Sequence, residues 1–100
     1  MRTLDLSVYE VHLDNIETGA KTIEFREMTD YWIERLVDMA KLPGKTPSEV
    51  RLMLLRGEEV PFVQYDEVVF HSGERSLSTE YVGISTYKNH RLFAIRIRMK

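Results

Sequence analysis

The sequence predicts an α+β protein that forms a small β-barrel of about five strands with two to three helices. Several short segments alternate apolar and polar residues with the period of two that is typical of β-strands. Helix start and stop signals separate the first two of these segments and then fill residues 30–57. The last three segments follow one another with only turns between them, as antiparallel strands do. Five short alternating strands suit a barrel that closes on itself, with the helical segment across one opening.

The first strand and the first helix are expected before residue 19. Apolar and polar residues alternate over residues 4–7, which predicts a short strand. Residues 7–10 (Ser-Val-Tyr-Glu) have the form of a capping box, so we expect a helix that starts there and runs to Thr18. Its inner face has four members: Tyr9, His12, Leu13 and Ile16. Gly19 is expected to end this helix.

A second strand follows at once and carries charged residues. Alternation puts Ile23 and Phe25 on one face, which we expect to be the apolar one. Glu24 and Arg26 then share the other face, about 7 Å apart along the strand. This pattern fits either an exposed edge strand with a surface ion pair or a site built on rigid backbone.

Lys21, Glu24 and Arg26 together have the chemistry to bind an anion or a nucleobase. An arginine fork fits phosphate or a base edge, a glutamate accepts from exocyclic amines, and a lysine supplies a point charge. Alternation alone puts Lys21 on the face opposite to the other two residues. We therefore expect Lys21 to join them only if the turn after Gly19 twists the start of the strand. The alternative is a structural network of ion pairs.

The region between residues 30 and 57 is expected to hold two helices. Asp30 offers an N-cap for the first of them, which Pro43 and Gly44 end. Its expected buried stripe consists of Trp32, Ile33, Leu36, Val37 and Ala40. Residues 46–49 (Thr-Pro-Ser-Glu) form a capping box with proline at the first helical position, which predicts a third helix that stops at Gly57.

Three strands are expected at about 66–72, 80–87 and 92–99. The last has the clearest alternation, with an apolar face made of Phe93, Ile95, Ile97 and Met99. Its other face carries Arg96, Arg98 and Lys100. Together with Arg91 these residues form a basic stripe, which we interpret as a solvated face that protects a sheet edge, with contact to an RNA backbone as the alternative.

The second helix also carries an aromatic and basic group at Tyr31, Trp32 and Arg35. An aromatic ring beside an arginine is a common arrangement for stacking single-stranded bases and holding their phosphates. The place of Trp32 on the apolar stripe favours a role in the core. Tyr31 and Arg35, at positions i and i+4 on the flank, are better placed for a ligand. His71, near the end of a strand, is expected either to line the barrel mouth or to belong to an ordinary turn.

Composition limits the classes of function. One hundred residues fit a single domain spanning 1–100. The chain has no cysteine, and its three histidines lack metal-ligand spacing, so we expect neither a metal site nor a cofactor. A net charge of −2 argues against a large non-specific nucleic-acid footprint, so any such contact must be local.

The same composition bears on location. No apolar run approaches the length of about 18 residues that a membrane span requires, so no membrane partner is expected. The N-terminus lacks the apolar region of a signal peptide. Together these observations predict a cytoplasmic protein.

The spacing G-x-K-x-x-E-x-R, formed by Gly19, Lys21, Glu24 and Arg26 after a short helix, resembles the signature of ASCH domains. These are small relatives of the PUA barrel that are linked to RNA. Three further pairs, at 26–27, 31–32 and 35–36, resemble the R-E…Y-W-x-x-R-L run of small stand-alone bacterial and phage members, and 65–70 resembles the strand after the insert of the family. The resemblance covers about residues 4–72.

This resemblance implies a PUA-like barrel that binds RNA, a nucleotide or a nucleoside in a cleft between the motif strand and the second helix. The implied ligand-binding residues are Lys21, Glu24, Arg26, Tyr31, Arg35 and His71.

An enzyme is the first alternative. Some small ASCH proteins resemble amidohydrolases that cleave an acyl group from a modified cytidine with the motif lysine, a threonine and a downstream glutamate. Here Glu24 occupies the position of the threonine, and Thr22 lies two residues away from it, whereas Glu74 is plausibly placed for the downstream acid. This departure argues against that activity. Other ASCH proteins are reported as ribonucleases, for which Lys21, Glu24 and Arg26 would be the catalytic residues. A protein-interaction module is the third class, and the acidic composition suits it.

Overall fold

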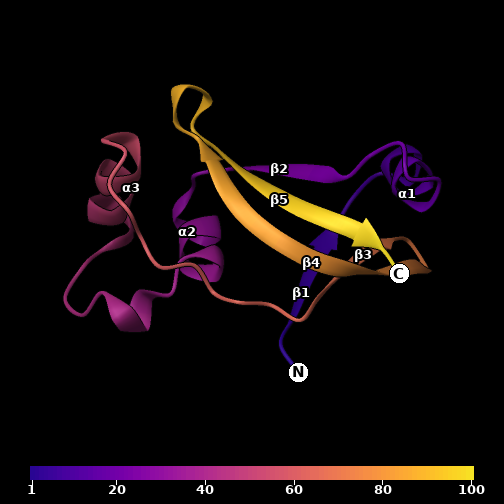
Figure 1. Ribbon diagram of the computed structural model, residues 1–100, viewed down its shortest axis with the longest axis horizontal. Helices are drawn as coiled ribbons and strands as arrows, with labels where there is room; N and C mark the ends of the chain where they lie inside the picture. The colour runs from indigo at the N-terminus through magenta and orange to yellow at the C-terminus, as the bar shows by residue number, and fades with distance from the viewer. The chain divides into compact units, whose positions relative to one another are not determined.

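The structure, a computed structural model, describes residues 1–100 and has three α-helices and a five-stranded mixed sheet (Figure 1). The strand order is β1-β3-β4-β5-β2. β1 pairs with β3 in parallel, and β3 pairs with β4 antiparallel. The α+β class, the five strands and the three helices are therefore confirmed. Closure into a barrel and a PUA-like arrangement stay predictions.

The strands are β1 (Thr3–Ser7), β2 (Ile23–Glu27), β3 (Glu67–Ser72), β4 (Arg75–Tyr87) and β5 (Leu92–Met99). The helices are α1 (Glu10–Glu17), α2 (Asp30–Leu36) and α3 (Pro47–Leu55), with short 3₁₀ turns η1 (Met39–Lys41) and η2 (Lys88–His90). The chain forms two compact units, which we describe separately. Unit 1 contains residues 1–24, 64–83 and 95–100, and unit 2 contains residues 25–63 and 84–94. None of the helices is both long enough and apolar enough to cross a membrane.

The core of unit 1 is built around the parallel pair β1–β3. Their register puts Leu4 beside Val68 and Leu6 beside Phe70, and all four side chains are buried. α1 adds two more buried residues, Leu13 and Ile16. Burial of six such side chains contributes about 1.5–3 kcal/mol each before the entropy of folding is set against it.

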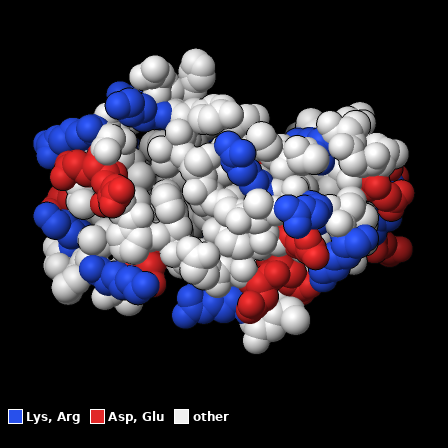
Figure 2. Space-filling model, in the orientation of Figure 1, with Lys and Arg blue, Asp and Glu red and all other residues white.

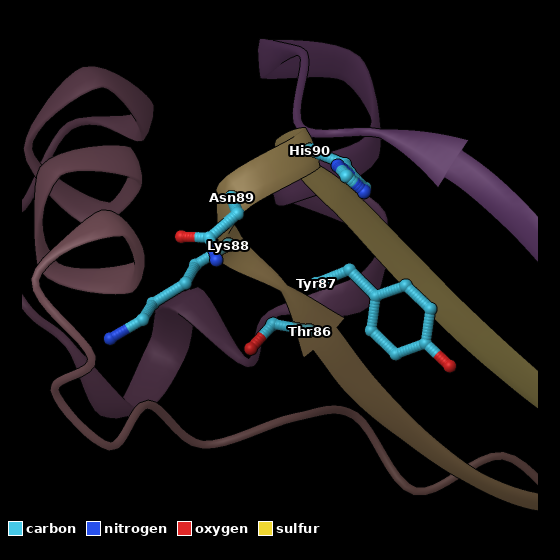
Figure 3. A pocket seen from close by; sticks show the side chains of 5 residues that line it. All are labelled: Thr86, Tyr87, Lys88, Asn89 and His90. Atoms are coloured by element: carbon cyan, nitrogen blue, oxygen red, sulfur yellow. The ribbon is translucent and has the colours of Figure 1, made fainter.

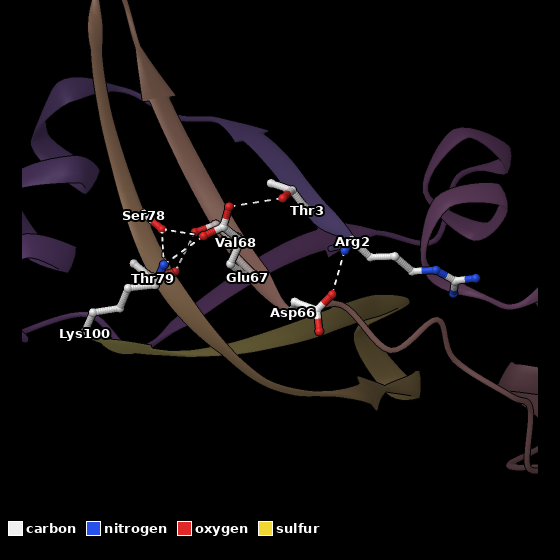
Figure 4. A network of polar contacts seen from close by, with 8 residues as sticks. All are labelled: Arg2, Thr3, Asp66, Glu67, Val68, Ser78, Thr79 and Lys100. Atoms are coloured by element: carbon white, nitrogen blue, oxygen red, sulfur yellow. Dashed lines mark hydrogen bonds and ion pairs between the residues drawn. The ribbon is translucent and has the colours of Figure 1, made fainter.

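A polar network around Glu67 links the strands of unit 1 (Figure 4). The Glu67 carboxylate accepts hydrogen bonds from Lys100 Nζ at 2.8 Å, Ser78 Oγ at 2.8 Å and Thr3 Oγ1 at 3.1 Å. The hydrogen bond from Lys100 contributes most, followed by those from Ser78 and Thr3, and together they lower the pKa of Glu67 from 4.5 to about 2. This carboxylate joins β1, β4 and the C-terminal residue to β3.

Two expectations for unit 1 are wrong. α1 begins at Glu10 after an N-cap at Tyr9 whose side chain makes no cap hydrogen bond, so residues 7–10 are not a capping box. Ser7 instead belongs to β1 and pairs with His71, because the backbone ladder continues past it. β4 begins at Arg75 rather than at 80, since Gly73, with φ +59°, allows a two-residue hairpin loop directly after β3.

In unit 2 the third helix forms as expected. Thr46 Oγ1 accepts the backbone N–H of Glu49 at 3.2 Å, and Pro47 is the first helical residue. Gly57, with φ +78°, follows the last turn. The predicted cap of the second helix is wrong by one residue, because the Thr29 hydroxyl accepts the N–H of Trp32 and Asp30 lies inside the helix.

α2 is also shorter than its apolar stripe suggested. It ends at Leu36, and Val37 turns to extended backbone and forms a β-bridge with Phe62. The bridge is held by a hydrogen bond of 2.9 Å from the Val63 N–H to the Leu36 carbonyl. Ala40, expected in the stripe, is exposed. The core of unit 2 contains Met28, Ile33, Leu36, Val37, Val50, Leu54, Phe93 and Ala94.

Candidate functional site

The turn between α1 and β2 brings Lys21 and Glu24 together in unit 1. Gly19 has φ +82°, which a residue with a side chain rarely adopts, and its N–H bonds to the Ile16 carbonyl. The Lys21 N–H then donates to the Asn15 carbonyl at 3.0 Å and folds the chain back along α1. This is the twist that the sequence required, and it leaves Lys21 Nζ 2.8 Å from Glu24 Oε1.

The two faces of β2 are inverted relative to the expectation from alternation. Glu24 is only 5% exposed, whereas Phe25 is 40% exposed. The exposed ring of Phe25 packs against Tyr87, with a distance of 5.3 Å between ring centroids. Burial of the Glu24 carboxylate is tolerated because Lys21 pairs with it. Glu24 is therefore not part of a surface ion pair.

His12 is a third member of this group that the sequence did not identify. Its Nδ1 lies 3.3 Å from Lys21 Nζ. The sequence indicated only that His12 shares a helix face with Leu13, because the contact depends on the fold of the turn rather than on spacing. We call Lys21, Glu24 and His12 the lysine group. In it, the Lys21 ammonium lies within hydrogen-bond reach of both a carboxylate and an imidazole.

A second group lies in unit 2, where Arg26 of β2 contacts Trp32 of α2, which is itself part of a set with Tyr31 and Arg35. Arg26 Cζ is 5.3 Å from the centroid of the Trp32 ring. Arg35 Cζ is 3.3 Å from the centroid of the Tyr31 ring, and Arg35 Nη1 donates to the Tyr31 carbonyl. The two rings meet edge to face at 4.9 Å. We call these four residues the Arg–aromatic cluster.

The Arg–aromatic cluster is on the surface. Tyr31 is 52% exposed, and Arg35 is also exposed. Trp32 is only partly covered, so the expectation that it belongs to the core is wrong. Cation–π contacts of this kind contribute about 0.5–1 kcal/mol each at exposed sites.

The remaining residues of the sequence-based site have other partners. His71 Nε2 lies 2.8 Å from Asp5 Oδ1 on the neighbouring strand β1. In the basic stripe, Arg96 and Arg98 are exposed as expected, and Arg98 pairs with Glu80 at 3.5 Å. On the face that Figure 2 shows, basic side chains are interspersed with acidic ones.

No cluster of three or more histidine, aspartate or glutamate side chains capable of holding a metal ion is present in residues 1–100. Comparison of the chain with protein-family models, curated proteins and solved structures found no significant match.

Proposed function

We propose that this protein is an ASCH-type, PUA-like domain of the cytoplasm that binds a short single-stranded RNA segment or a nucleotide at the Arg–aromatic cluster. The observation that carries the proposal is the pair of arginines that lie over aromatic rings, one of them over the exposed ring of Tyr31. Proteins recognise unstacked bases by stacking them on aromatic rings and on guanidinium planes. The same arginines have N–H donors that suit phosphate oxygens.

The binding site needs to contact only a few nucleotides. Stacking contributes about 1–3 kcal/mol per base, so two bases suffice for measurable affinity without a basic surface. A protein with a net charge of −2 cannot rely on many phosphate contacts. The cluster offers aromatic rings for stacking and two cations for phosphate contacts within four residues.

Fluorescence anisotropy with a labelled single-stranded RNA tests the proposal. Replacing Arg26 or Arg35 by alanine should weaken binding by about 1–3 kcal/mol, the range for a lost charge-assisted hydrogen bond. Arg96→Ala and Arg98→Ala, which remove cations from the basic stripe, serve as matched controls and should change little. Loss of affinity in the stripe variants, with none in the cluster variants, would refute the proposal.

A small hydrolase acting on a nucleoside or RNA is the second candidate, and the lysine group favours it. A lysine between a buried carboxylate and an imidazole has the components of acid–base chemistry. The two functions are separable by assay, because binding stabilises the protein without turnover, whereas a hydrolase yields product that disappears in Lys21→Ala. Capture of a partner protein, with neither nucleotide binding nor product, would instead favour an interaction module.

A further inference from the structure

A hollow of about 610 Å³ lies in unit 2 where the end of β2 and the start of α2 meet the hairpin between β4 and β5. Its volume falls in the range of about 300–1,000 Å³ that small-molecule sites occupy. The walls are held together by the Met28 N–H, which donates to the Arg91 carbonyl at 3.0 Å. Arg51 of α3 adds a second link, since its Nε donates to the Met28 carbonyl at 2.7 Å and its guanidinium pairs with Asp30.

Arg91 is the most unusual residue of the hollow. It is the one non-glycine residue with positive φ, at +54°, a conformation in which a Cβ atom is unfavourable. The surroundings hold it there, since its N–H bonds to the Lys88 carbonyl and its own carbonyl accepts from Met28. A glycine would fit this backbone without strain. An arginine at such a position points to a use for its side chain.

Two charged groups of the hollow are available to a ligand. Arg51 and Asp30 neutralise each other, whereas the exposed side chains of Arg91 and Glu27 make no hydrogen bond or ion pair. Met28 and Leu92 add apolar surface to the lining. A ligand that uses all these groups offers acceptors to a guanidinium, donors to a carboxylate and some apolar surface. A simple anion does not fit, because the Glu27 carboxylate would repel it.

We infer that this hollow binds a guanine base. Guanine presents O6 and N7 as a pair of acceptors that an arginine fork matches, and N1–H and N2–H as donors that a carboxylate accepts. Adenine replaces the O6 acceptor by an amino donor, which an arginine cannot pair with. The inference rests on the proposed function for the ligand class alone, since its residues are distinct from the Arg–aromatic cluster.

Calorimetric titration of the full chain with guanosine, adenosine and cytidine monophosphates tests the inference. Guanosine monophosphate should bind at least about tenfold more tightly than adenosine monophosphate. Arg91→Gly should remove most of this preference while the melting temperature stays equal or rises, because glycine relieves the positive φ. Glu27→Gln should also reduce the preference. Lys88→Ala is the matched control, since Lys88 belongs to the same hairpin but points toward α3 (Figure 3).

The outcomes separate this inference from the proposed function. Equal affinity for the three nucleotides, or a guanine preference that survives Arg91→Gly, overturns the guanine site. Binding of a guanine-free RNA that depends on Arg35 would uphold the proposed function in that case. In another outcome, the guanine preference depends on Arg91, but RNA binding is unchanged by replacement of Arg26 or Arg35. This result would uphold the guanine site and refute the role of the cluster.

Discussion

The lysine group of unit 1 and the Arg–aromatic cluster of unit 2 both contain cations from the sequence motif or its continuation, yet their surroundings differ. Lys21 is paired with a carboxylate that is 5% exposed, and it also contacts a histidine. In the cluster, Arg35 lies over the ring of Tyr31, which is 52% exposed, and Arg26 lies over the ring of Trp32, which is partly covered. We therefore assign Lys21, which neutralises a buried charge, to folding, and we propose the arginines of the cluster as ligand contacts. Burial thus separates the two roles.

The largest expected effect is on the stability of unit 1. Glu24→Ala should lower the free energy of unfolding by about 3 kcal/mol, at the lower end for a broken buried pair because Lys21 still reaches water. Urea unfolding should show a midpoint lower by about 1 M or more. Glu27→Ala, an exposed glutamate of the same strand, should stay within about 0.5 kcal/mol of the parent. Equal stability of the two variants would contradict a structural role for Glu24 and favour the hydrolase.

The salt dependence of RNA binding tests how many phosphate groups the Arg–aromatic cluster contacts. If the cluster makes about one to three phosphate contacts, log K should fall with log salt with a slope of about −0.7 to −2. Anisotropy titrations over a tenfold range of salt measure this slope. A much steeper slope would mean that a wider set of cations, such as the basic stripe, carries the affinity.

Acid unfolding tests whether another charge of unit 1 serves folding. The folded-state pKa of Glu67, about 2, lies below the ordinary value of 4.5. Its ionised form therefore stabilises the fold fully above pH 4.5, and this contribution is lost as the pH falls toward 2. The difference in unfolding free energy between the parent and Glu67→Gln should shrink over this window. A difference that stays constant with pH would show that Lys100, Ser78 and Thr3 do not favour the ionised carboxylate.

The smallest expected effect concerns catalysis. Deacylation of an acylated cytidine should be absent or very weak, because Glu24 replaces the threonine that the resemblance associates with that reaction. Chromatography of the reaction mixture detects the free nucleoside. Clear turnover that disappears in Lys21→Ala would restore the amidohydrolase assignment and would give the lysine group a role beyond folding.

The sequence predicted those elements whose signals are local. The third helix follows from Thr46 and Glu49 because a capping box acts within four residues. β5 follows from alternation because Phe93, Ile95 and Ile97 are all buried. The sequence predicts that Lys21 joins Glu24 and Arg26 only if the turn after Gly19 twists the start of the strand, and in the structure Lys21 pairs with Glu24 after a positive φ at Gly19.

The remaining features depend on contacts between distant segments. The predicted inward face of β2 rested on only two apolar residues, Ile23 and Phe25. In the structure Glu24, paired with Lys21, is buried instead, and Phe25 is exposed. Ser7 is a residue type that often caps a helix, but here its backbone pairs with His71 in the ladder between β1 and β3. The contact of His12 with Lys21 and the hydrogen bond from Met28 to the Arg91 carbonyl both depend on how turns fold. Short-range sequence patterns do not encode this.

The most direct test of the account compares two exposed tyrosines. Tyr31 belongs to the Arg–aromatic cluster, whereas Tyr9, which is 80% exposed, lies before α1 and serves as the matched control. Anisotropy with a single-stranded RNA should show binding about tenfold weaker in Tyr31→Ala, as for the loss of one stacked base, and unchanged binding in Tyr9→Ala. Equal affinities for the parent and Tyr31→Ala would contradict the claim that the exposed cluster binds nucleic acid.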